Sequence, residues 1–249
     1  MECNPCVLVP IYNQVVELPG ALLAANSLRL PVILVNDGSD EQCSITIQTL
    51  AQEHNTLLVT HLKNKGKGAA IKSGLQKAQG AGFTHALQID ADGQHNTDDI
   101  PRFLQVMRTR ADALVAGYPQ FDESIPGYRF YGRYATHIWV WINTLSLRIR
   151  DSMCGFRVYP VAASCDLINT ERIGNRMDFD CEFIVRWYWR GYAIEQLQTK
   201  VIYPEGGDSN FRIILDNMLI TRMHARLFFG MLRRLPRLLK RRGAGNDAG

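Results

Sequence analysis

Short apolar runs of the β-strand type alternate with helical patterns along the first half of this 249-residue chain. Five runs fit buried strands, at Val7–Val9, Val32–Val35, Leu57–Leu62, His85–Ile89 and Ala113–Ala116. The helical patterns between them cover Glu17–Leu28, Glu41–Glu53, Gly68–Ala78 and Asp98–Arg110. Apolar strands in alternation with helices predict an α/β fold, in which helices cover both faces of a mostly parallel sheet.

Polar residues follow four of these strands directly. They form four short segments: Pro10-Ile11-Tyr12-Asn13, Asn36-Asp37-Gly38-Ser39, Asn64-Lys65-Gly66-Lys67-Gly68 and Asp90-Ala91-Asp92-Gly93-Gln94-His95. Ligands of parallel α/β sheets bind outside the carboxyl ends of the strands. We therefore expect the four segments to meet at one edge of the sheet and to form a single binding site.

Asp90 and Asp92 are the strongest metal candidates. Residues i and i+2 leaving a strand turn toward one ligand where the chain bends, and Gly93 permits that bend. Two neighbouring carboxylates repel each other unless a cation neutralises them. Hard oxygen ligands suit Mg²⁺ or Mn²⁺, and Gln94 offers a further oxygen. A solvated turn is the competing interpretation, because D-x-D-G is common in loops.

The segment from Asn64 to Gly68 places two glycines and two lysines before a helix. Such a helix entry favours anions, so it is a candidate phosphate site, although it matches neither a P-loop nor G-x-G-x-x-G. A plain glycine-rich helix entry remains the alternative. Asp37 is either a turn residue or a carboxylate that accepts from a nucleobase or ribose.

The four segments, in this order and with Val9 and Val35 before the first two, resemble the signature of family 2 glycosyltransferases. They are most similar to the dolichyl- and polyprenyl-phosphate sugar transferases. Two further elements resemble that branch, Cys154-Gly155-Phe156-Arg157 and Phe179-Asp180-Cys181-Glu182. The resemblance covers roughly residues 5 to 205. It implies a GT-A fold and an inverting transfer from a nucleotide sugar, UDP- or GDP-linked.

The resemblance also implies roles for individual residues. Metal binding falls to Asp90, Asp92 and Gln94. The predicted nucleotide-binding residues are Pro10, Tyr12, Asn13, Asp37, Lys67, Gly68 and Asp90. The predicted catalytic residues are Asp92, Asp180, Glu182 and Arg157. Gln14 stands where many relatives have an acid, and Gly117-Tyr118-Pro119 lacks a basic residue that often helps to bind phosphate.

The acceptor is a separate question, because a hydroxyl acceptor needs a general base and a lipid phosphate needs cations instead. Asp180 and Glu182, just before a helix expected at Phe183–Trp189, are candidate bases. Their other interpretation is helix N-terminal charge. Arg129 and Arg133 are candidate ligands of an acceptor phosphate. The family's base motif Q-x-x-R-W keeps only Arg186-Trp187, which favours a polyprenyl phosphate acceptor.

The C-terminal segment carries the positive excess of the chain. The net charge is +4, yet from Asn217 onward eight Lys or Arg accompany one acid. On a helix the basic residues share a narrow arc and apolar residues take the opposite side: Arg222, Arg226, Arg233, Arg237 and Lys240 against Met223, Leu227, Phe228, Met231, Leu232, Leu235, Leu238 and Leu239. This pattern predicts an amphipathic helix on an anionic membrane surface. A helix packed on the domain, with its basic face in water, is the alternative.

These observations predict a GT-A domain over 1–210, an amphipathic helical extension over 211–242 and a disordered tail over 243–249. No segment reaches the roughly 20 apolar residues of a membrane span. The start carries no signal peptide, so we expect a cytoplasmic protein at the inner face of the plasma membrane. Nucleic acid is not expected, since no aromatic-rich basic surface accompanies the tail.

Two other functions compete with a transferase. A sugar-phosphate nucleotidyltransferase normally opens with a glycine-rich loop carrying Arg after the first strand, and Pro10-Ile11-Tyr12-Asn13 stands there instead. A non-catalytic nucleotide-sugar-binding scaffold at the membrane would be favoured by loss of a metal ligand, whereas Asp90 and Asp92 are both present.

Overall fold

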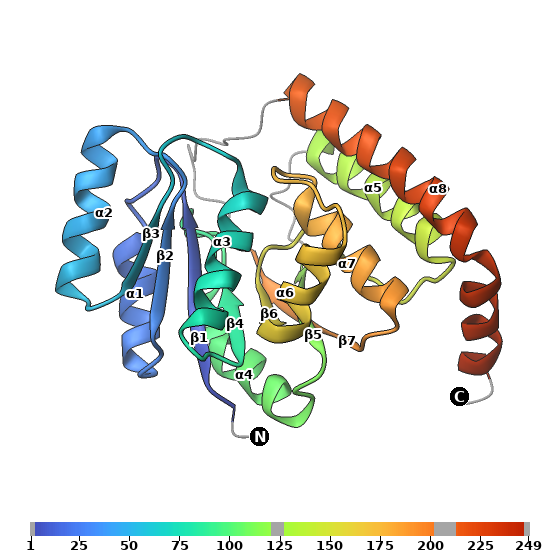
Figure 1. Ribbon diagram of the computed structural model, residues 1–249, viewed down its shortest axis with the longest axis horizontal. Coiled ribbons are helices and arrows are strands. Elements are labelled where there is room, and N and C mark those ends of the chain that lie inside the picture. Colours follow the sequence, from blue (N-terminus) through green and yellow to red (C-terminus); the bar gives the residue numbers. More distant parts are fainter. Residues whose placement is uncertain (1–2, 121–126, 202–212, 247–249) are drawn as a thin grey trace.

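A computed structural model describes residues 3–120, 127–201 and 213–246, with side chains described for 3–120, 133–201 and 215–241 (Figure 1). The strands are β1 (Pro5–Ile11), β2 (Val32–Asn36), β3 (Leu57–Thr60), β4 (His85–Gln88), β5 (Leu114–Gln120), β6 (Arg157–Pro160) and β7 (Ile194–Lys200). The helices are α1 (Leu18–Ser27), α2 (Glu41–Glu53), α3 (Lys67–Gly80), the 3₁₀ turn η1 (Thr97–Asp99), α4 (Ile100–Thr109), α5 (Gly127–Thr144), α6 (Val161–Thr170), α7 (Phe179–Arg190) and α8 (Ile213–Asn246).

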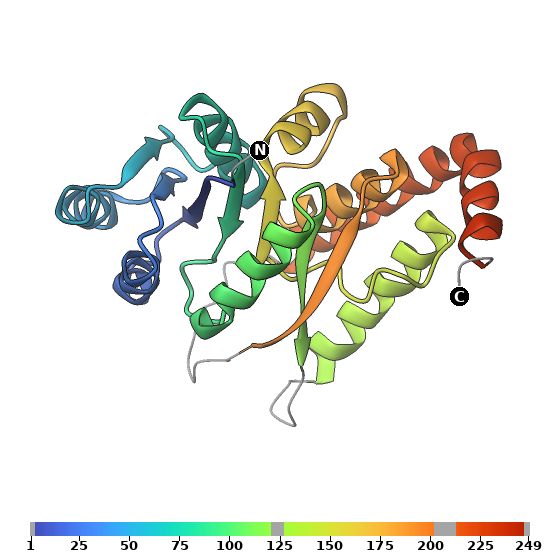
Figure 2. The ribbon, with the colours of Figure 1, turned by 90° about the horizontal axis from the view of Figure 1, so that it is seen from below.

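The strands form one seven-stranded sheet in the order β3-β2-β1-β4-β6-β5-β7. All neighbouring pairs are parallel except the two that involve β6, which runs antiparallel to β4 and to β5. Figure 2 shows the sheet between helical layers, with α3 and α6 on one side and α1 and α4 on the other. The predicted mostly parallel α/β sheet with helices on both faces is confirmed.

Alternate residues of each strand supply two hydrophobic cores. On β1, Cys6 and Leu8 face the core formed with α3, α6, α7 and α8, whereas Val7 and Val9 face the core formed with α1, α2 and α4. Successive side chains of a strand point to opposite faces, so a strand covered on both sides must be apolar throughout. This requirement explains the uninterrupted apolar runs of the sequence.

All five predicted strands are present, and the helices expected at Phe183–Trp189 and over 211–242 correspond to α7 and α8. β6, α6 and β7 have no counterpart among the expected elements. α7 begins at Phe179, four residues before the predicted start at Phe183, so Asp180 and Glu182 lie in its first turn and not ahead of it. Both acids therefore take positions fixed by the helix.

The C-terminal helix is longer than predicted and belongs to the domain. α8 spans Ile213–Asn246, so it includes residues 243–246 of the predicted disordered tail, and 247–249 lie outside the described residues. It packs on α5 and α7, and it buries Met223, Leu227, Met231 and Leu238. It bends toward its C-terminal end (Figure 1), as expected for a helix that contains Pro236. No helix in the described ranges is long and apolar enough to cross a membrane.

Candidate active site

Three loops meet at the carboxyl ends of β1, β2 and β3, at the upper edge of the sheet in Figure 1. The backbone N–H of Asn13 donates to Ser39 Oγ (3.1 Å), and the backbone N–H of Asp40 donates to Asn13 Oδ1 (2.9 Å). Asn36 Oδ1 accepts from the backbone of Ser39 (2.9 Å). Side chains that bond the backbone of a neighbouring loop hold the loops in a fixed relation before any ligand arrives.

Asp37 organises the third of these loops. Its carboxylate, 2% exposed as a residue, accepts from the backbone N–H of Lys65 (3.0 Å) at Oδ1 and of Gly66 (2.7 Å) at Oδ2. The imidazole Nδ1 of His61 lies 2.6 Å from Oδ1. Two oxygens with three partners leave little capacity for a further hydrogen bond. The contact of Asp37 with base or ribose stays a prediction. In the structure its carboxylate holds the Lys65–Gly66 loop.

The fourth loop brings Asp90 to a lysine. Lys67, the first residue of α3, places its ammonium 2.7 Å from Asp90 Oδ2 and 3.3 Å from Asp180 Oδ2. Gln88 Nε2 donates to the other oxygen of Asp90 (2.9 Å). The start of α3, the loop after β4 and the start of α7 thus meet around the ammonium group of Lys67. The sequence singled out all three charged residues, and the structure brings them together.

The charges at this centre depend on one another. Burial opposes the ionised form of Asp90, but Lys67, His95 and the hydrogen bonds outweigh it and lower the pKa of Asp90 to about 2. Burial likewise works to lower the pKa of Lys67, yet the carboxylates of Asp180 and Asp90 outweigh it and hold that pKa well above its usual range. Lys67 is therefore a permanent cation at the site.

Asp92 has the opposite balance. Burial, followed by the charge of Asp90, raises the pKa of Asp92 above its ordinary value. Its Oδ1 accepts from the backbone N–H of Gln94 (3.1 Å). A carboxylate destabilised by a like charge gains from any cation placed beside it, and this is a physical reason for a metal at this loop.

The residues present fit a cation that arrives with a diphosphate. Within the described ranges, no group of three His, Cys, Asp or Glu side chains is arranged to hold a metal ion. Mg²⁺, however, is usually bound by one or two carboxylates together with substrate phosphates and water. Asp90, Asp92 and the amide of Gln94 match that donor set. Metal binding by these three residues stays a prediction.

The antiparallel direction of β6 carries the Cys154–Arg157 element to the site. Gln88 at the end of β4 pairs with Arg157 at the start of β6, so the residues before β6 lie at the edge where the parallel strands end. A Cβ atom on Gly155 would lie 2.5 Å from Asp90 Oδ2 and 2.8 Å from Lys67 Nζ. Only glycine leaves this space open, so Gly155 covers the Asp90–Lys67 pair directly.

Replacement of Gly155 by alanine is expected to lower turnover by about ten- to a hundredfold, because the new methyl group must displace Asp90 or Lys67. Overpacking of this size typically costs about 1–3 kcal/mol, so the fold should survive. Steady-state turnover and thermal unfolding measure the two effects. Gly80→Ala is the matched control, since a Cβ there meets nothing within 4 Å. Unchanged turnover in Gly155→Ala would contradict this assignment.

Two further residues shape the site: Gln88, which was not predicted, and His95, which belongs to a predicted segment but had no role assigned to it. Gln88 bridges Asp90 and the hydroxyl of Tyr159, which donates to Gln88 Oε1 (2.9 Å). His95 Nδ1 accepts from the backbone N–H of Asp90 (3.2 Å), and its ring stacks on Phe156 at 5.2 Å. The signal for Gln88 was a polar residue inside an otherwise apolar strand.

Arg157 and Glu182, two of the predicted catalytic residues, are enclosed in the structure. Both are 0% exposed. Arg157 donates to the backbone carbonyls of Ser152 (2.7 Å) and Cys154 (2.9 Å), and also to that of Asp180 (2.8 Å). Glu182 accepts from Arg186 (2.7 Å), Arg226 and a backbone N–H. These hydrogen bonds fix the segments that carry Gly155 and Asp180, and a catalytic role for Arg157 or Glu182 stays a prediction.

The predicted acceptor-phosphate residues lie on α5. The side chain of Arg129 is outside the described part of the chain. Arg133 Nε lies 2.6 Å from Asp151 Oδ2, and this ion pair, together with His137, holds the pKa of Asp151 below its usual range against the effect of burial. Arg133 is therefore engaged by a buried carboxylate.

The remaining predicted nucleotide-binding residues lie along the same sheet edge. Pro10 belongs to β1, and Tyr12 follows that strand beside Asn13. Gly68 lies in the first turn of α3, directly after Lys67. A nucleotide role for these residues stays a prediction.

Comparison with known proteins agrees with this geometry. Residues 6–169 match the model of the glycosyl transferase family 2. The human dolichyl-phosphate beta-glucosyltransferase is 27% identical over 202 residues, which cover 72% of this chain and 61% of that protein. The undecaprenyl-phosphate mannosyltransferase of Micrococcus luteus is 27% identical over 188 residues, covering 69% of this chain and 74% of that protein.

A solved structure shares the fold. The mannosyltransferase PcManGT from Pyrobaculum calidifontis, in complex with GDP-Man and Mn²⁺, superposes with a TM-score of 0.57 at 15% identity, covering 100% of this chain and 76% of that one. The chain spans about 60–66% of the length of the dolichyl-phosphate beta-glucosyltransferases that it matches. The likeness thus covers the fold of this chain and part of the length of those longer proteins.

Proposed function

Because the chain belongs to glycosyl transferase family 2, we propose that it moves a sugar from a UDP- or GDP-linked donor to a lipid-linked acceptor, a polyprenyl phosphate. In this proposal the transfer inverts the configuration at the anomeric carbon of the sugar and needs Mg²⁺ or Mn²⁺. Support comes from relatives that are named for dolichyl phosphate and undecaprenyl phosphate, and from a neighbour of the same fold with GDP-Man and Mn²⁺.

The observation that carries this proposal is the ammonium group of Lys67, which lies between Asp90 and Asp180 where the four motif loops meet. In this proposal Lys67 attracts the diphosphate of the donor, and Asp90, Asp92 and Gln94 share a divalent ion with that diphosphate. The contacts of Lys67 with Asp90 and Asp180 support it. When bound, the divalent ion would act as a Lewis acid on the leaving group. Gln88 holds Asp90 by a hydrogen bond (2.9 Å), and the absence of a side chain on Gly155 leaves the space that Asp90 occupies.

The state of the candidate bases favours a phosphate acceptor. Glu182 is enclosed by two arginines, and Asp180 lies against Lys67 (3.3 Å) and Arg157 (3.8 Å). Both carboxylates are thus already paired with cations of the protein, whereas a lipid phosphate is itself an anion and needs no general base. One oxygen of Asp180, Oδ1, has no hydrogen-bond partner among the described residues. This oxygen is the candidate general base for a hydroxyl group as sugar acceptor, which is the second candidate.

A donor and acceptor screen tests the proposal. UDP- and GDP-sugars are offered with Mg²⁺ or Mn²⁺ to a polyprenyl phosphate and, in parallel, to the corresponding polyprenol and to soluble glycosides. Transfer to the phosphate alone supports the proposal, and transfer to a hydroxyl supports the second candidate. Release of pyrophosphate would indicate a nucleotidyltransferase. Binding without turnover of any donor would indicate a scaffold, and either result would refute the transferase.

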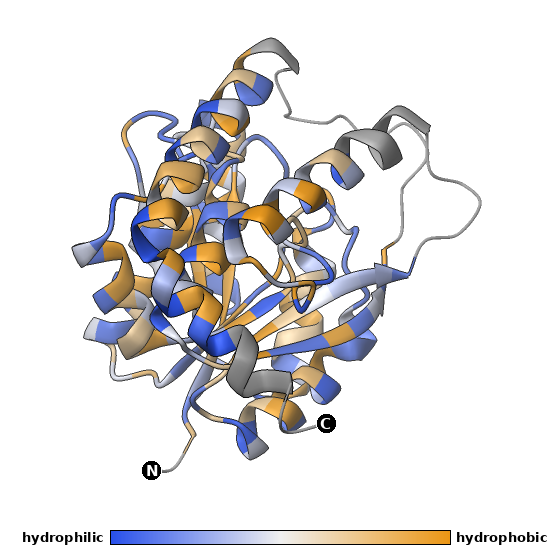
Figure 3. Ribbon diagram, turned by 90° about the vertical axis from the view of Figure 1, so that its right-hand side faces the viewer, coloured by the Kyte–Doolittle hydropathy of each residue, from blue (hydrophilic) through white to orange (hydrophobic). Residues whose placement is uncertain are grey.

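The membrane part of the proposal rests on the face formed by α5 and α8. The exposed side chains of α5 within the described range include Tyr134, Ile138, Trp139 and Ile142, and none of them is charged. On α8, Phe229 is 63% exposed. Figure 3 faces this side of the molecule and shows apolar residues in orange along both helices.

A basic rim borders this apolar face. Among the described side chains of α8, the rim consists of the exposed residues Arg222, Arg233, Arg237 and Lys240. Arg241 is also exposed, but it donates to the backbone carbonyls of Tyr188 and Trp189 at the end of α7. Arg226, predicted to share their arc, turns inward to Glu182 and is not part of the rim. Tryptophan and tyrosine favour the membrane interface, and arginine and lysine are attracted to anionic lipid. We propose an anionic bilayer as the partner of this face, with Trp139 inserted and the arginines at the headgroups.

Replacing Arg233 and Arg237 together by glutamine is expected to weaken binding to vesicles rich in an anionic phospholipid by roughly tenfold or more. Both residues are exposed on α8, so the fold should be unaffected. Cosedimentation at low and at physiological salt measures the effect, and the loss should be largest at low salt.

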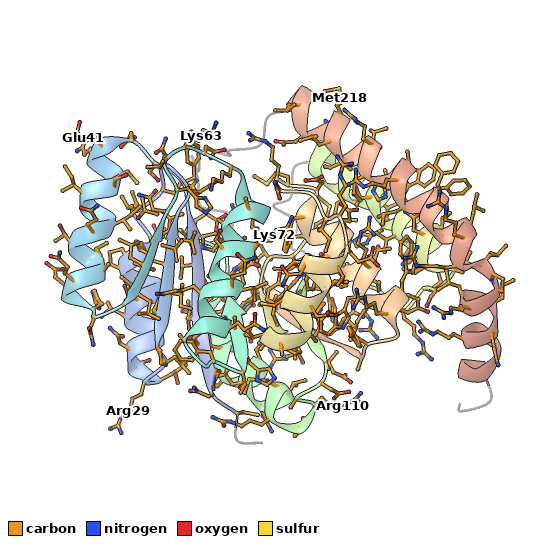
Figure 4. All side chains as sticks on the ribbon, in the orientation of Figure 1. Arg29, Glu41, Lys63, Lys72, Arg110 and Met218 are labelled. Carbon is orange, nitrogen blue, oxygen red and sulfur yellow. The ribbon has the colours of Figure 1, made fainter. Side chains whose placement is uncertain are left out.

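The matched control replaces two exposed arginines far from α8, Arg29 and Arg108, in the same way. Arg29 lies at the opposite side of the molecule from α8 (Figure 4). Equal loss of binding in both double variants would mean that net charge alone decides binding. Unchanged binding in the α8 variant would refute this docking face.

A further inference from the structure

One arginine of the C-terminal helix is turned into the protein. Arg226 of α8 contacts both oxygens of Glu182 on α7, with Nη2 at 2.6 Å from Oε2 and Nε at 3.1 Å from Oε1. Glu182 is 0% exposed. A buried carboxylate requires cations and hydrogen bonds, and a two-point contact from a planar guanidinium fixes its direction. Arg186 supplies a second cation from α7 itself, at 2.7 Å from Oε1.

The same carboxylate holds the segment before α7. Oε2 of Glu182, the atom nearest to Arg226, also accepts the backbone N–H of Gly174 (2.9 Å). From the other side, Lys72 of α3 donates to the carbonyl of Ile173 (2.6 Å) and to Asn175 Oδ1 (2.7 Å). Lys72 lies centrally between the two halves of the molecule (Figure 4). Segment 173–178 is therefore tied to α8 through Glu182 and to α3 through Lys72.

This segment lies on the loop that leads into α3. The backbone N–H of Ala69 donates to the carbonyl of Asn175 (3.0 Å). A Cβ atom on Gly66 would lie 2.4 Å from that carbonyl oxygen, and one on Gly68 would lie 2.5 Å from Phe179 Cβ. The glycines of the Asn64–Gly68 motif are thus required by the close approach of segment 173–178 and the start of α7.

The contact reaches the charged centre of the site. Lys67 stands between Gly66 and Gly68, and its ammonium contacts Asp90 and Asp180. The backbone of Lys67 lies in the first turn of α3, and segment 173–178 packs against that turn through Asn175. A shift of that segment would move Lys67 relative to the two carboxylates.

We infer that Arg226, through Glu182 and Gly174, positions segment 173–178 against the Gly66–Gly68 loop and so supports binding of the nucleotide donor. Arg226 is a positioning residue, not a catalytic one. The donor-binding part of this inference rests on the proposed function, whereas the mechanical link from α8 to the loop does not. The C-terminal helix then has two roles on two faces, one toward a membrane and one toward the donor site.

Arg226→Met keeps the unbranched aliphatic stem of the side chain and removes the charged guanidinium group. Amide hydrogen exchange without ligand is expected to become faster at Gly174, because its bond to Glu182 loses support. A smaller acceleration is expected at Ala69, whose N–H donates both to the carbonyl of Asn175 (3.0 Å) and to that of Gly66 (2.9 Å). Affinity for UDP or GDP with Mn²⁺, measured by calorimetry, is expected to fall about three- to tenfold for the nucleotide that the wild type binds. In steady state the donor KM should rise with little change in kcat. Arg226→Lys should restore part of both effects.

The matched control is Arg234→Met, another arginine of α8 whose acidic partner is Glu171 at 3.5 Å and which packs over Trp189. It should lower the unfolding temperature without changing exchange at Ala69 or nucleotide affinity. Unchanged exchange at Gly174 or at Ala69 in Arg226→Met would overturn the link. Faster exchange with unchanged affinity would overturn the donor role. If the wild type binds neither nucleotide, the proposed function fails, and the exchange result still decides the link.

Discussion

Replacement of Asp92 by asparagine is expected to reduce sugar transfer by about a hundred- to a thousandfold while leaving the fold intact. The substitution preserves the acceptor for the backbone N–H of Gln94 and removes the negative charge proposed to share a divalent ion with the leaving diphosphate. Lewis-acid stabilisation of that group is worth several kcal/mol, and each 1.36 kcal/mol corresponds to a factor of about ten in rate.

The stability of this variant should move in the opposite direction to its activity. Burial and the charge of Asp90 raise the pKa of Asp92, so the ionised form of this side chain is electrostatically unfavourable at this position. A neutral asparagine relieves that repulsion, and the unfolding temperature should stay equal or rise. Transfer assays with Mn²⁺ and thermal unfolding without metal measure the two quantities.

Asp98→Asn is the matched control, since Asp98 is an exposed acid six residues further along the chain. It should leave transfer and metal affinity unchanged. Full activity of Asp92→Asn, or full activity of the wild type in excess chelator, would refute the proposed metal role.

Asp37→Asn is expected to weaken nucleotide binding by about ten- to a hundredfold and to lower the unfolding temperature. An amide in place of the carboxylate cannot accept at both positions, so Lys65 or Gly66 loses its acceptor and a buried N–H is left unsatisfied. Hydrogen bonds to charged groups are worth about 1.5–3 kcal/mol each, which sets the size of the effect. Calorimetry with UDP or GDP and thermal unfolding check it.

Exchange in the free protein separates the two roles that Asp37 can play. If Asp37 organises the loop, the amides of Lys65 and Gly66 exchange faster in Asp37→Asn before any nucleotide is added. If Asp37 acts only by touching the nucleotide, exchange in the free protein stays as in the wild type, and that result would refute the loop role. Asp40→Asn, which alters the N-cap of α2 in the same turn, is the control and should leave nucleotide affinity unchanged.

The sequence by itself determined the architecture of the first half and the edge at which the site lies. A strand covered on both faces must be apolar throughout, so the central strands β1 and β2 are visible as apolar runs. Parallel strands present all their carboxyl ends at one edge, so residues following different strands had to meet. This is why Lys67, Asp90 and Asp92 were identified before the fold was known.

The tertiary structure alone decided which of the remaining charged residues face a ligand. Arg157, Glu182 and Arg226 belong to motif-like or amphipathic patterns, yet the packing of β6, α7 and α8 encloses Arg157 and Glu182 and turns Arg226 toward Glu182. Asp180, two residues before Glu182 on the same helix turn, points to Lys67 instead. The sequence pattern reports which residues are charged and how they are spaced along an element. Whether a charge meets solvent, substrate or a buried counter-charge depends on neighbours that are distant in the chain, and only the packed structure brings those neighbours together.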